Sequence, residues 1–521
     1  MPSRSLFVVI ILILALAAMA MLNIATPAGA GLSNDSAAYI AGARSILQGK
    51  GYSDIWLDSE LEAITHYPPL LSLTLAAIGL LNIDPLRGVR ILNVLLFGAN
   101  TVLMGWLGWR ATRSQVAGIW LAVIFMLNAS LLRVHVYALS EPLFLFLSLL
   151  CFLFIDLYLT PSSNPDNAGK QKMAWVALAG VTAGLAFLTR YSGLALLPVF
   201  AAALMLQRKS WLARLKSTAV FFAAAIPPMA AWFVRNKLTA GNVTNRSFHY
   251  HPITAENILP GFYNFAQFIL PFDSGQKALL KSGWLEGLLA IFGFGLMIWL
   301  ALRVWPGTGM APKSLSFTST LYIFGYLGAV LFSMSFFDAS TKFLPRILAP
   351  LYVSLMLLSA AGGVWLFRTN KRVLQGLAIS LALVTLAISA YGSQQSLPTL
   401  AEAGQGYASW KWHDSVLMAS LRNLPSGTAI YTNTPPAVYL VTGRASRTLP
   451  SAIDPVDDLP RANYQQDLAQ MRADLLAGRA VLALFDTSSL EDALKIQDSS
   501  DFVKGLVVLQ KTQGDILYGK P

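Results

Sequence analysis

The stretch that decides the fold class is Glu141-Pro-Leu-Phe-Leu-Phe-Leu-Ser-Leu-Leu-Cys-Phe-Leu-Phe-Ile-Asp-Leu-Tyr-Leu159. It is almost entirely apolar, and a helix of this length can cross the hydrocarbon core of a bilayer. Ten further stretches have the same character, at 6–24, 89–109, 115–132, 173–189, 192–207, 215–234, 284–302, 315–336, 346–367 and 373–391. The sequence therefore predicts a polytopic α-helical membrane protein with about 11 transmembrane helices.

The composition agrees with a membrane protein. Hydrophobic residues make up 55% of the chain and charged residues only 12%, against about 25% charged in a soluble domain. We assign the net charge of +12 to basic cytoplasmic loops, and expect no nucleic acid as a partner, because no basic face interleaved with aromatic residues occurs. The single cysteine, Cys151, excludes an intrachain disulfide and a cysteine metal site.

A twelfth, shorter apolar stretch at 69–82 decides the predicted orientation. If it does not cross the membrane and the N-terminus is cytoplasmic, every cytoplasmic loop is basic, as the positive-inside rule requires. We therefore expect 69–82 to be a juxtamembrane or re-entrant helix. The protein is expected in the cell (inner or plasma) membrane, embedded in the lipid bilayer, with its N-terminus cytoplasmic and its C-terminus outside.

The first apolar stretch allows two interpretations. Arg4, the apolar run and Ala28-Gly29-Ala30 resemble a signal peptide with a small-residue cleavage site. The run is long for the hydrophobic part of a signal peptide, which favours a retained first span. Both interpretations leave the later topology unchanged, because the residues that follow lie outside either way.

The residues after the last apolar stretch predict a separate domain. We divide the chain into a transmembrane domain, 1–391, and an extracytoplasmic domain, 392–521. Helices are predicted over 416–421 and 464–476, and strands over 429–431 and 481–485. A hairpin is predicted from the runs 505–509 and 515–518, which flank the Gln-Gly-Asp turn at 513–515. This pattern is typical of a small α/β domain.

The predicted outer rim of the membrane domain collects residues that are unusual near hydrocarbon. A carboxylate there is costly and is a functional candidate by default. Acids and bases that converge on one membrane face suggest an anionic, membrane-borne substrate and an acid–base step. The candidates are Asp35, Tyr39, His66, Tyr67, Glu141, Arg190, Lys342 and Arg346, with His249 and His251 in a neighbouring loop.

Each candidate also has a purely structural interpretation. Asp35 could only cap the helix that follows it, and Glu141 could be a helix-start acid beside Pro142. Arg190 and Arg346 could extend to lipid head groups. The two loop histidines resemble a zinc pair, but no third ligand is apparent, and the Tyr-Pro-Pro sequence at 67–69 could simply start a helix.

Five motifs, taken in order, carry a resemblance to a known family. They are Asn-Asp-Ser-Ala-Ala-Tyr at 34–39 with Ala-Arg-Ser-Ile-Leu-Gln-Gly-Lys-Gly at 43–51, Tyr-Pro-Pro-Leu at 67–70, Leu-Ser-Glu-Pro-Leu-Phe at 139–144, the segment 184–194, and Pro-Arg-Ile-Leu-Ala-Pro-Leu-Tyr at 345–352. Together they resemble the polyprenyl-phosphate-dependent GT-C type glycosyltransferases, which include protein O-mannosyltransferases and lipid A aminoarabinose transferases. The resemblance covers about 30–395.

The resemblance implies roles for several residues. It makes Asp35 the catalytic base and Glu141 the second catalytic acid. The aminoarabinose transferases have a lysine before Pro-Pro that holds the lipid phosphate, whereas this chain has Tyr67. His66, Lys342 or Arg346 could hold the phosphate instead, and Tyr39, Tyr67 and Arg190 are expected among the substrate contacts.

The implied function is an inverting glycosyltransferase that moves a sugar from a polyprenyl-phosphate-linked donor to a glycan, lipid or protein acceptor on the outer face. A single displacement needs a base for the acceptor and cations for the leaving phosphate. Two carboxylates could bind a divalent metal, but a monophosphate donor does not need one, so no cofactor is expected. The alternative is a transporter or flippase, which should show broken helices and internal repeats; no repeat is found.

Overall fold

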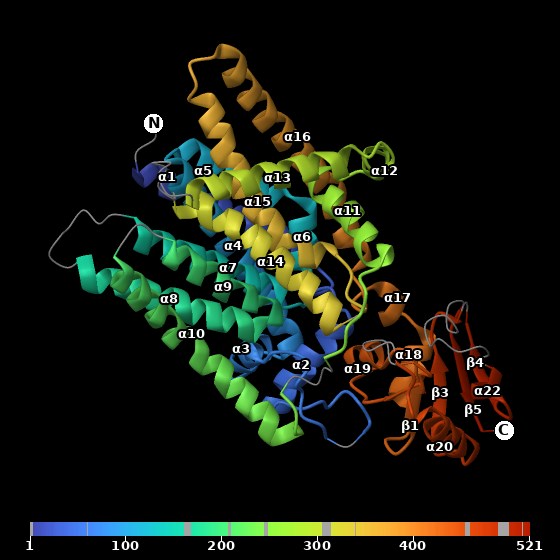
Figure 1. Ribbon diagram of the computed structural model, residues 1–521. Helices are drawn as coiled ribbons and strands as arrows, with labels where there is room; N and C mark the ends of the chain where they lie inside the picture. The colour runs from blue at the N-terminus through green and yellow to red at the C-terminus, as the bar shows by residue number, and fades with distance from the viewer. Residues whose placement is uncertain are drawn as a thin grey trace.

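The computed structural model describes residues 4–59, 61–160, 168–206, 210–243, 248–304, 314–338, 340–453, 459–487, 500–512 and 514–520. The first part of the chain is a bundle of helices (Figure 1). In order these are α1 (Arg4–Ala25), α2 (Asn34–Leu47), α3 (Leu70–Gly79), α4 (Pro85–Thr112), α5 (Gln115–Leu127), α6 (Ala129–Val136), α7 (Glu141–Leu159), α8 (Ala168–Thr189), η1 (Tyr191–Ala195), α9 (Leu196–Met205), α10 (Trp211–Ala240), α11 (Ala255–Ile269), α12 (Asp273–Lys281), α13 (Trp284–Val304), α14 (Ser314–Phe336), α15 (Pro345–Phe367) and α16 (Arg372–Ala403).

The predicted polytopic helical membrane fold is confirmed. Nine helices of the described chain are long and apolar enough to cross a membrane, namely α1, α4, α7, α8, α10, α13, α14, α15 and α16. The pair α5 and α6, bent by 59°, makes a tenth if it counts as one span. The span expected at 192–207 is shorter than expected, because a 3-10 turn, η1, precedes the ten-residue helix α9.

The stretch at 69–82 forms only the ten-residue helix α3. This helix is too short to cross a bilayer, in agreement with a juxtamembrane helix. Leu71 and Leu75 are fully buried, and α3 packs against α2 and α4. The helix α3 therefore anchors the end of the first long loop, which carries Tyr67, to the bundle.

Small residues let the membrane helices approach closely. On α8, a Cβ at Gly180 would lie 2.3 Å from the backbone oxygen of Phe221, and a Cβ at Gly184 2.6 Å from that of Ala225. This glycine pair, four residues apart, sets the α8–α10 contact in the way that small residues do in membrane bundles. The helix α1 packs against α4 and α5, with Phe7 and Leu22 among its buried residues.

The last part of the chain forms the small α/β domain that the sequence predicts. Its helices are α17 (Trp410–His413), α18 (Val416–Asn423), α19 (Pro435–Thr442), α20 (Tyr464–Leu476) and α22 (Ser500–Val503), and its strands β1 (Ala429–Thr432), β2 (Arg447–Thr448), β3 (Ala480–Leu484), β4 (Val507–Lys511) and β5 (Ile516–Gly519). The sheet order is β2-β1-β3-β5-β4. Strand β1 runs parallel to β2 and β3, and β5 runs antiparallel to β3 and β4.

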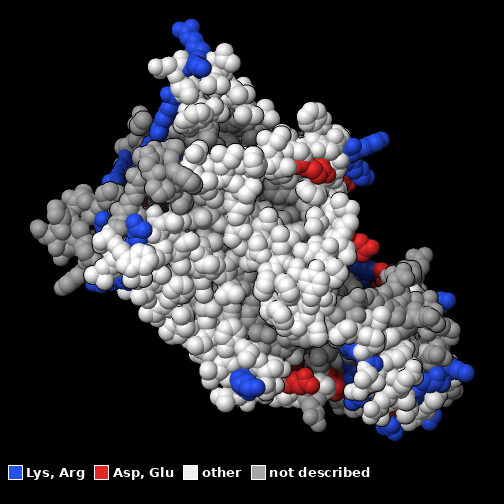
Figure 2. Space-filling view, viewed as in Figure 1, with Lys and Arg blue, Asp and Glu red and all other residues white. Residues whose placement is uncertain are grey.

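The α/β domain sits at one end of the helix bundle, where its helix α19 packs against α2 (Figure 1). The helix α16, expected to end near 391, continues to Ala403 and leads directly into this domain. Figure 2 shows a wide uncharged surface over the bundle, with Lys and Arg gathered beyond it and over the α/β domain. This distribution is the one expected for a bundle that passes through a bilayer.

Candidate active site

Asp35 lies in the first turn of α2, but it does not cap that helix. The cap is Ser33, whose backbone N–H donates to the Ser36 hydroxyl at 2.9 Å. The Asp35 carboxylate turns away from the helix start and forms an ion pair with Arg346. The capping interpretation of Asp35 is therefore wrong, and its carboxylate is available to a site between helices.

Tyr67 holds the Asp35 carboxylate from the other side. Its hydroxyl donates to Asp35 Oδ1 at 3.0 Å. The Tyr67 ring packs edge-on against the Tyr39 ring, with centroids 5.3 Å apart, and its backbone oxygen accepts from the Tyr52 hydroxyl at 3.2 Å. The tyrosine that replaces the expected lysine is thus a hydrogen-bond donor to the predicted base.

Glu141 begins α7 and is almost completely buried, with 1% of its side chain exposed. It forms an ion pair with Arg190, and its Oε1 lies 3.8 Å from Nε of Arg346. Neither Glu141 oxygen accepts an aligned hydrogen bond from the described part of the chain. Its charge is therefore compensated by the guanidinium groups of Arg190 and Arg346.

Ser140 connects Tyr39, which lies on the same helix as Asp35, with Arg190, which pairs with Glu141. Its hydroxyl accepts from the Tyr39 hydroxyl at 3.1 Å and from Arg190 at 3.2 Å. Ser140 occupies the cap position of α7 but makes no capping bond. Sequence reasoning missed this residue, because a serine before a helix-start acid is usually a cap.

The four charged groups bring two acids and two arginines together from α2, α7, α15 and the α8–η1 junction. Asp35 is 25% exposed, Arg346 31% and Arg190 20%. Glu141, by contrast, is 1% exposed, so the cluster is open to the surface at Asp35 and Arg346 and closed at Glu141. The formal charges cancel, which lets the cluster exist at a membrane boundary.

The electrostatics keep Asp35 ionised. Burial raises the pKa of Asp35, but the charge of Arg346 and the hydrogen bonds from Arg346 and Tyr67 outweigh it, so the pKa lies below its usual 3.8. Burial, followed by the charge of Asp35, raises the pKa of Tyr67, and the same two causes raise the pKa of Tyr39. Both tyrosines therefore stay protonated and act as donors.

A second layer of residues holds the segment that leads to Tyr67. Arg235 donates to the backbone oxygens of Ile64 at 2.6 Å and Tyr52 at 2.7 Å. Tyr191 donates to the Thr65 oxygen at 2.7 Å. Sequence reasoning named none of these contacts, although Arg235, a cation at the end of an apolar helix, was a signal that could have been followed.

The remaining predicted residues lie further from the centre. His66 contacts Tyr67, with ring centroids 4.9 Å apart. Lys342 is exposed, and its side chain makes no ion pair with the described residues of the site. His249 and His251 bond through their backbone N–H groups to the end of α14, and no group of three metal-ligating side chains occurs in the described chain.

Three comparisons agree with this architecture. Residues 65–238 match the family described as dolichyl-phosphate-mannose-protein mannosyltransferase. The crystal structure of ArnT from Cupriavidus metallidurans bound to undecaprenyl phosphate superposes with a TM-score of 0.57 at 13% identity, covering 99% of this chain and 98% of that one. The Archaeoglobus fulgidus oligosaccharyltransferase in its apo form gives a TM-score of 0.62 at 12% identity, covering 100% of this chain and 75% of that one. No curated protein sequence matches the chain.

The fold is that of the membrane glycosyltransferases of the GT-C type. Within that class, residues 65–238 match the model of the dolichyl-phosphate-mannose-protein mannosyltransferase family. The resemblance stated from the sequence motifs is confirmed by the shared fold and by the family match over 65–238. The transporter alternative has no comparable support.

Proposed function

We propose that the chain is an inverting glycosyltransferase that moves a sugar from a polyprenyl-phosphate donor to an acceptor on the outer face of the cell membrane. The observation that carries this proposal is the Asp35 carboxylate, which faces Arg346 and accepts from the Tyr67 hydroxyl. Its side chain is 25% exposed, whereas that of Glu141 is 1% exposed, so Asp35 is the acid of the pair that a substrate can reach. Asp35 is therefore the base, and Glu141 orients the acceptor.

Arg346 and Arg190 are the groups that bind the donor phosphate. A guanidinium can hold a phosphate with two parallel hydrogen bonds. Arg346 is paired with Asp35 in the structure, so an incoming phosphate exchanges with that carboxylate for Arg346. The exchange frees Asp35 for the acceptor, and donor binding thereby prepares the base.

The reaction is one displacement at the anomeric carbon. The acceptor oxygen or nitrogen forms a bond to that carbon while its bond to the phosphate oxygen breaks. The acceptor proton passes to Asp35, and the electron pair of the broken bond stays on the phosphate, which the arginines stabilise. Attack from the side opposite the phosphate inverts the anomeric configuration, and the products are the glycosylated acceptor and the polyprenyl phosphate.

The arginine pair supplies the positive charge that a divalent cation would otherwise bring. Each catalytic carboxylate is bound by a guanidinium, so neither is a free ligand for a metal. The Archaeoglobus fulgidus enzyme was crystallised in complex with Zn and sulfate. For this chain we expect activity to persist when a chelator removes divalent cations.

The test is transfer by the purified protein in lipid vesicles. Polyprenyl-phosphate sugars with an isotopic label are supplied with candidate acceptors, and the product mass identifies the transfer. Asp35→Asn keeps the size of the side chain but removes the base, so turnover should fall about 10²–10⁴-fold while the protein still folds. Asp467→Asn, an exposed acid of α20, is the matched control. Near wild-type transfer by Asp35→Asn would refute the assignment.

A further inference from the structure

The α/β domain contacts the segments on both sides of helix α2, which carries Asp35. We propose that this domain is a positioning element of the catalytic site, acting through Tyr407 and Gly406 at one point and through the Asp58–Arg447 ion pair at another. The inference rests on the proposed role of Asp35 as the base. Three separate contacts between the domain and the first loop support it.

The first contact is a strip of backbone pairing beside both acids. The Leu32 N–H donates to the Gln405 oxygen at 3.1 Å, and the Tyr407 N–H donates to the Leu32 oxygen at 2.9 Å. On its other side the same strand pairs with the segment before α7, where Gly31 bridges Tyr137. The paired residues lie only a few positions before Asp35 and Glu141, so the strip fixes where α2 and α7 begin relative to each other.

Two further features fix the geometry of this paired segment. The Tyr407 hydroxyl donates to Oδ1 of Asn34, the residue immediately before Asp35. Gly406 has a φ of +58°, and a Cβ there would lie 1.9 Å from the Leu32 oxygen. Only glycine fits so close an approach, and the chain therefore has one geometry at this junction.

The second contact extends the sheet of the α/β domain with a piece of the first loop. Strand β2 is the edge strand of the sheet. The Ser446 N–H donates to the Trp56 oxygen at 3.2 Å, and the Asp58 N–H donates back to the Ser446 oxygen at 3.0 Å. The loop that ends at Tyr67 is thus held by the main-chain pairing typical of an added strand.

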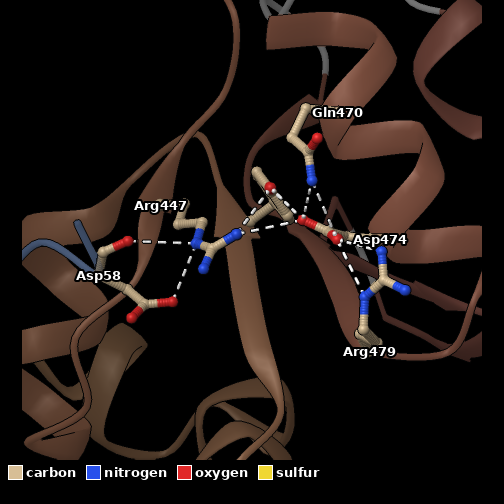
Figure 3. A network of polar contacts seen from close by, with 6 residues as sticks. Asp58, Arg447, Gln470, Asp474 and Arg479 are labelled. Atoms are coloured by element: carbon tan, nitrogen blue, oxygen red, sulfur yellow. Dashed lines mark hydrogen bonds and ion pairs between the residues drawn. The ribbon is translucent and has the colours of Figure 1, made fainter. Parts of the chain in front are cut away.

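An ion-pair network fixes the added strand (Figure 3). Arg447 Nε donates to Asp58 Oδ2 at 2.9 Å and to the Asp58 backbone oxygen at 3.1 Å. The same guanidinium donates to Asp474 Oδ2 at 3.1 Å. Asp474 is held in turn by Arg479 at 2.7 Å and by Gln470 at 3.3 Å. Arg447 is therefore oriented by the domain core before it meets the loop.

The third contact is directly on α2. The Arg44 guanidinium lies 5.6 Å from the ring centroid of Tyr439 on α19, and it also pairs with Asp84 at 2.9 Å. Helix α2 packs against α19 along this side. Its start, its flank and the loop that follows it therefore all contact the α/β domain.

The expected effect of loosening these contacts is on turnover and not on donor binding. A displacement of about 1 Å at a catalytic group can cost about 10²-fold in rate. In the proposed reaction Arg346 and Arg190 bind the donor phosphate. In the part of the chain that the structure describes, their ion pairs are with Asp35 and Glu141 and not with the α/β domain. The Michaelis constant for the donor should therefore change little.

The experiment uses the full chain in lipid vesicles. Tyr407→Phe removes one hydroxyl, and Asp58→Asn weakens the pair with Arg447. Each should lower kcat about tenfold or more and leave the donor KM within about twofold. Tyr464→Phe and Asp467→Asn make the same chemical changes on α20, away from the loop, and should leave both constants unchanged. Equal losses in the α20 variants, or wild-type kcat in both loop variants, would overturn the proposal.

Hydrogen exchange gives a readout that does not depend on activity. In Tyr407→Phe the backbone amides of 34–40 should exchange faster than in the wild type, while those of α20 should not change. Gly406→Ala should produce a larger effect of the same kind. Unchanged exchange at 34–40 in both variants would overturn the positioning role even if Asp35 is the base. Full activity in Asp35→Asn would instead remove the base on which the inference rests.

Discussion

Arg346 and Asp35, 311 residues apart in the sequence, form an ion pair where α15 and α2 begin. The pair joins the first loop of the chain to one of its last membrane helices. Glu141 lies behind it, 3.8 Å from the same guanidinium. Arg346 therefore connects both acids of the candidate site to a membrane helix.

Substitutions of Arg346 should show how much of donor binding depends on its positive charge and how much on the planar shape of its guanidinium group. Arg346→Ala is expected to raise the donor KM at least tenfold, because a hydrogen bond to a charged group contributes about 1.5–3 kcal/mol. Arg346→Lys should recover only part of the loss, since one point charge replaces a planar fork. Lys371→Ala, which removes an exposed cation at the α15–α16 turn, is the control. Unchanged donor kinetics in Arg346→Ala would reduce this residue to a head-group anchor.

Glu141→Gln should affect stability as well as rate. The side chain is 1% exposed and compensates Arg190 and Arg346. Removing its charge leaves a buried guanidinium without its partner, which costs about 3 kcal/mol or more. We expect a lower thermal midpoint in lipid vesicles and a loss of turnover. Asp35→Asn, at a more exposed position, should lose turnover with a smaller change in midpoint; the reverse order would contradict the burial difference.

The decline of the transfer rate at low pH should follow the protonation of Asp35. Burial raises the pKa of Asp35, but Arg346 and Tyr67 bring it below 3.8. A base with a lowered pKa loses its charge only as the pH falls through that lower value. The value of kcat/KM for the donor, which reports the free protein in which Arg346 pairs with Asp35, should therefore show no decline due to Asp35 above about pH 4. Arg346→Gln removes the positive charge that lowers the pKa of Asp35, so burial then raises this pKa. The decline in rate should therefore move to higher pH. An unmoved decline would count against Asp35 as the base.

Labelling from outside the cell should decide the orientation. The basic residues at the α15–α16 turn predict that this turn is cytoplasmic and that the α/β domain is outside. Single cysteines are placed at the exposed positions Asn370 and Gln466, in a chain that also carries Cys151→Ala. A membrane-impermeant thiol reagent should label Gln466→Cys and spare Asn370→Cys. Labelling of the α15–α16 turn alone would reverse the proposed topology.

The apolar runs were long enough to predict the bundle, because the period and length of a membrane helix are local properties of sequence. The α5–α6 bend at Asn128 and the 3-10 turn before α9 were not predicted, since tertiary contacts decide them. At Asn128, for example, the side chain caps α6 and also donates to the Phe268 oxygen at 2.8 Å. Such a contact has no local signature.

The site was predicted in part. The acids and arginines stood out because charge beside hydrocarbon is rare, and topology placed them on one face. Lys342 stood out for the same reason, but the structure leaves it exposed. Ser140 and Tyr407 could not be found, because a hydroxyl or an aromatic residue is ordinary in its local context. Their contacts join segments that are 101 and 373 residues apart.

The balanced charges of Asp35, Glu141, Arg190 and Arg346 have a consequence for product release in the proposed reaction. Before transfer, the donor phosphate is a diester with one negative charge; afterwards, the polyprenyl phosphate is a monoester with close to two. The arginines that stabilise the departing group therefore hold the spent lipid more tightly than the loaded one. Turnover then depends on Asp35, which has taken the acceptor proton, releasing that proton and pairing again as a carboxylate with Arg346 in place of the spent phosphate.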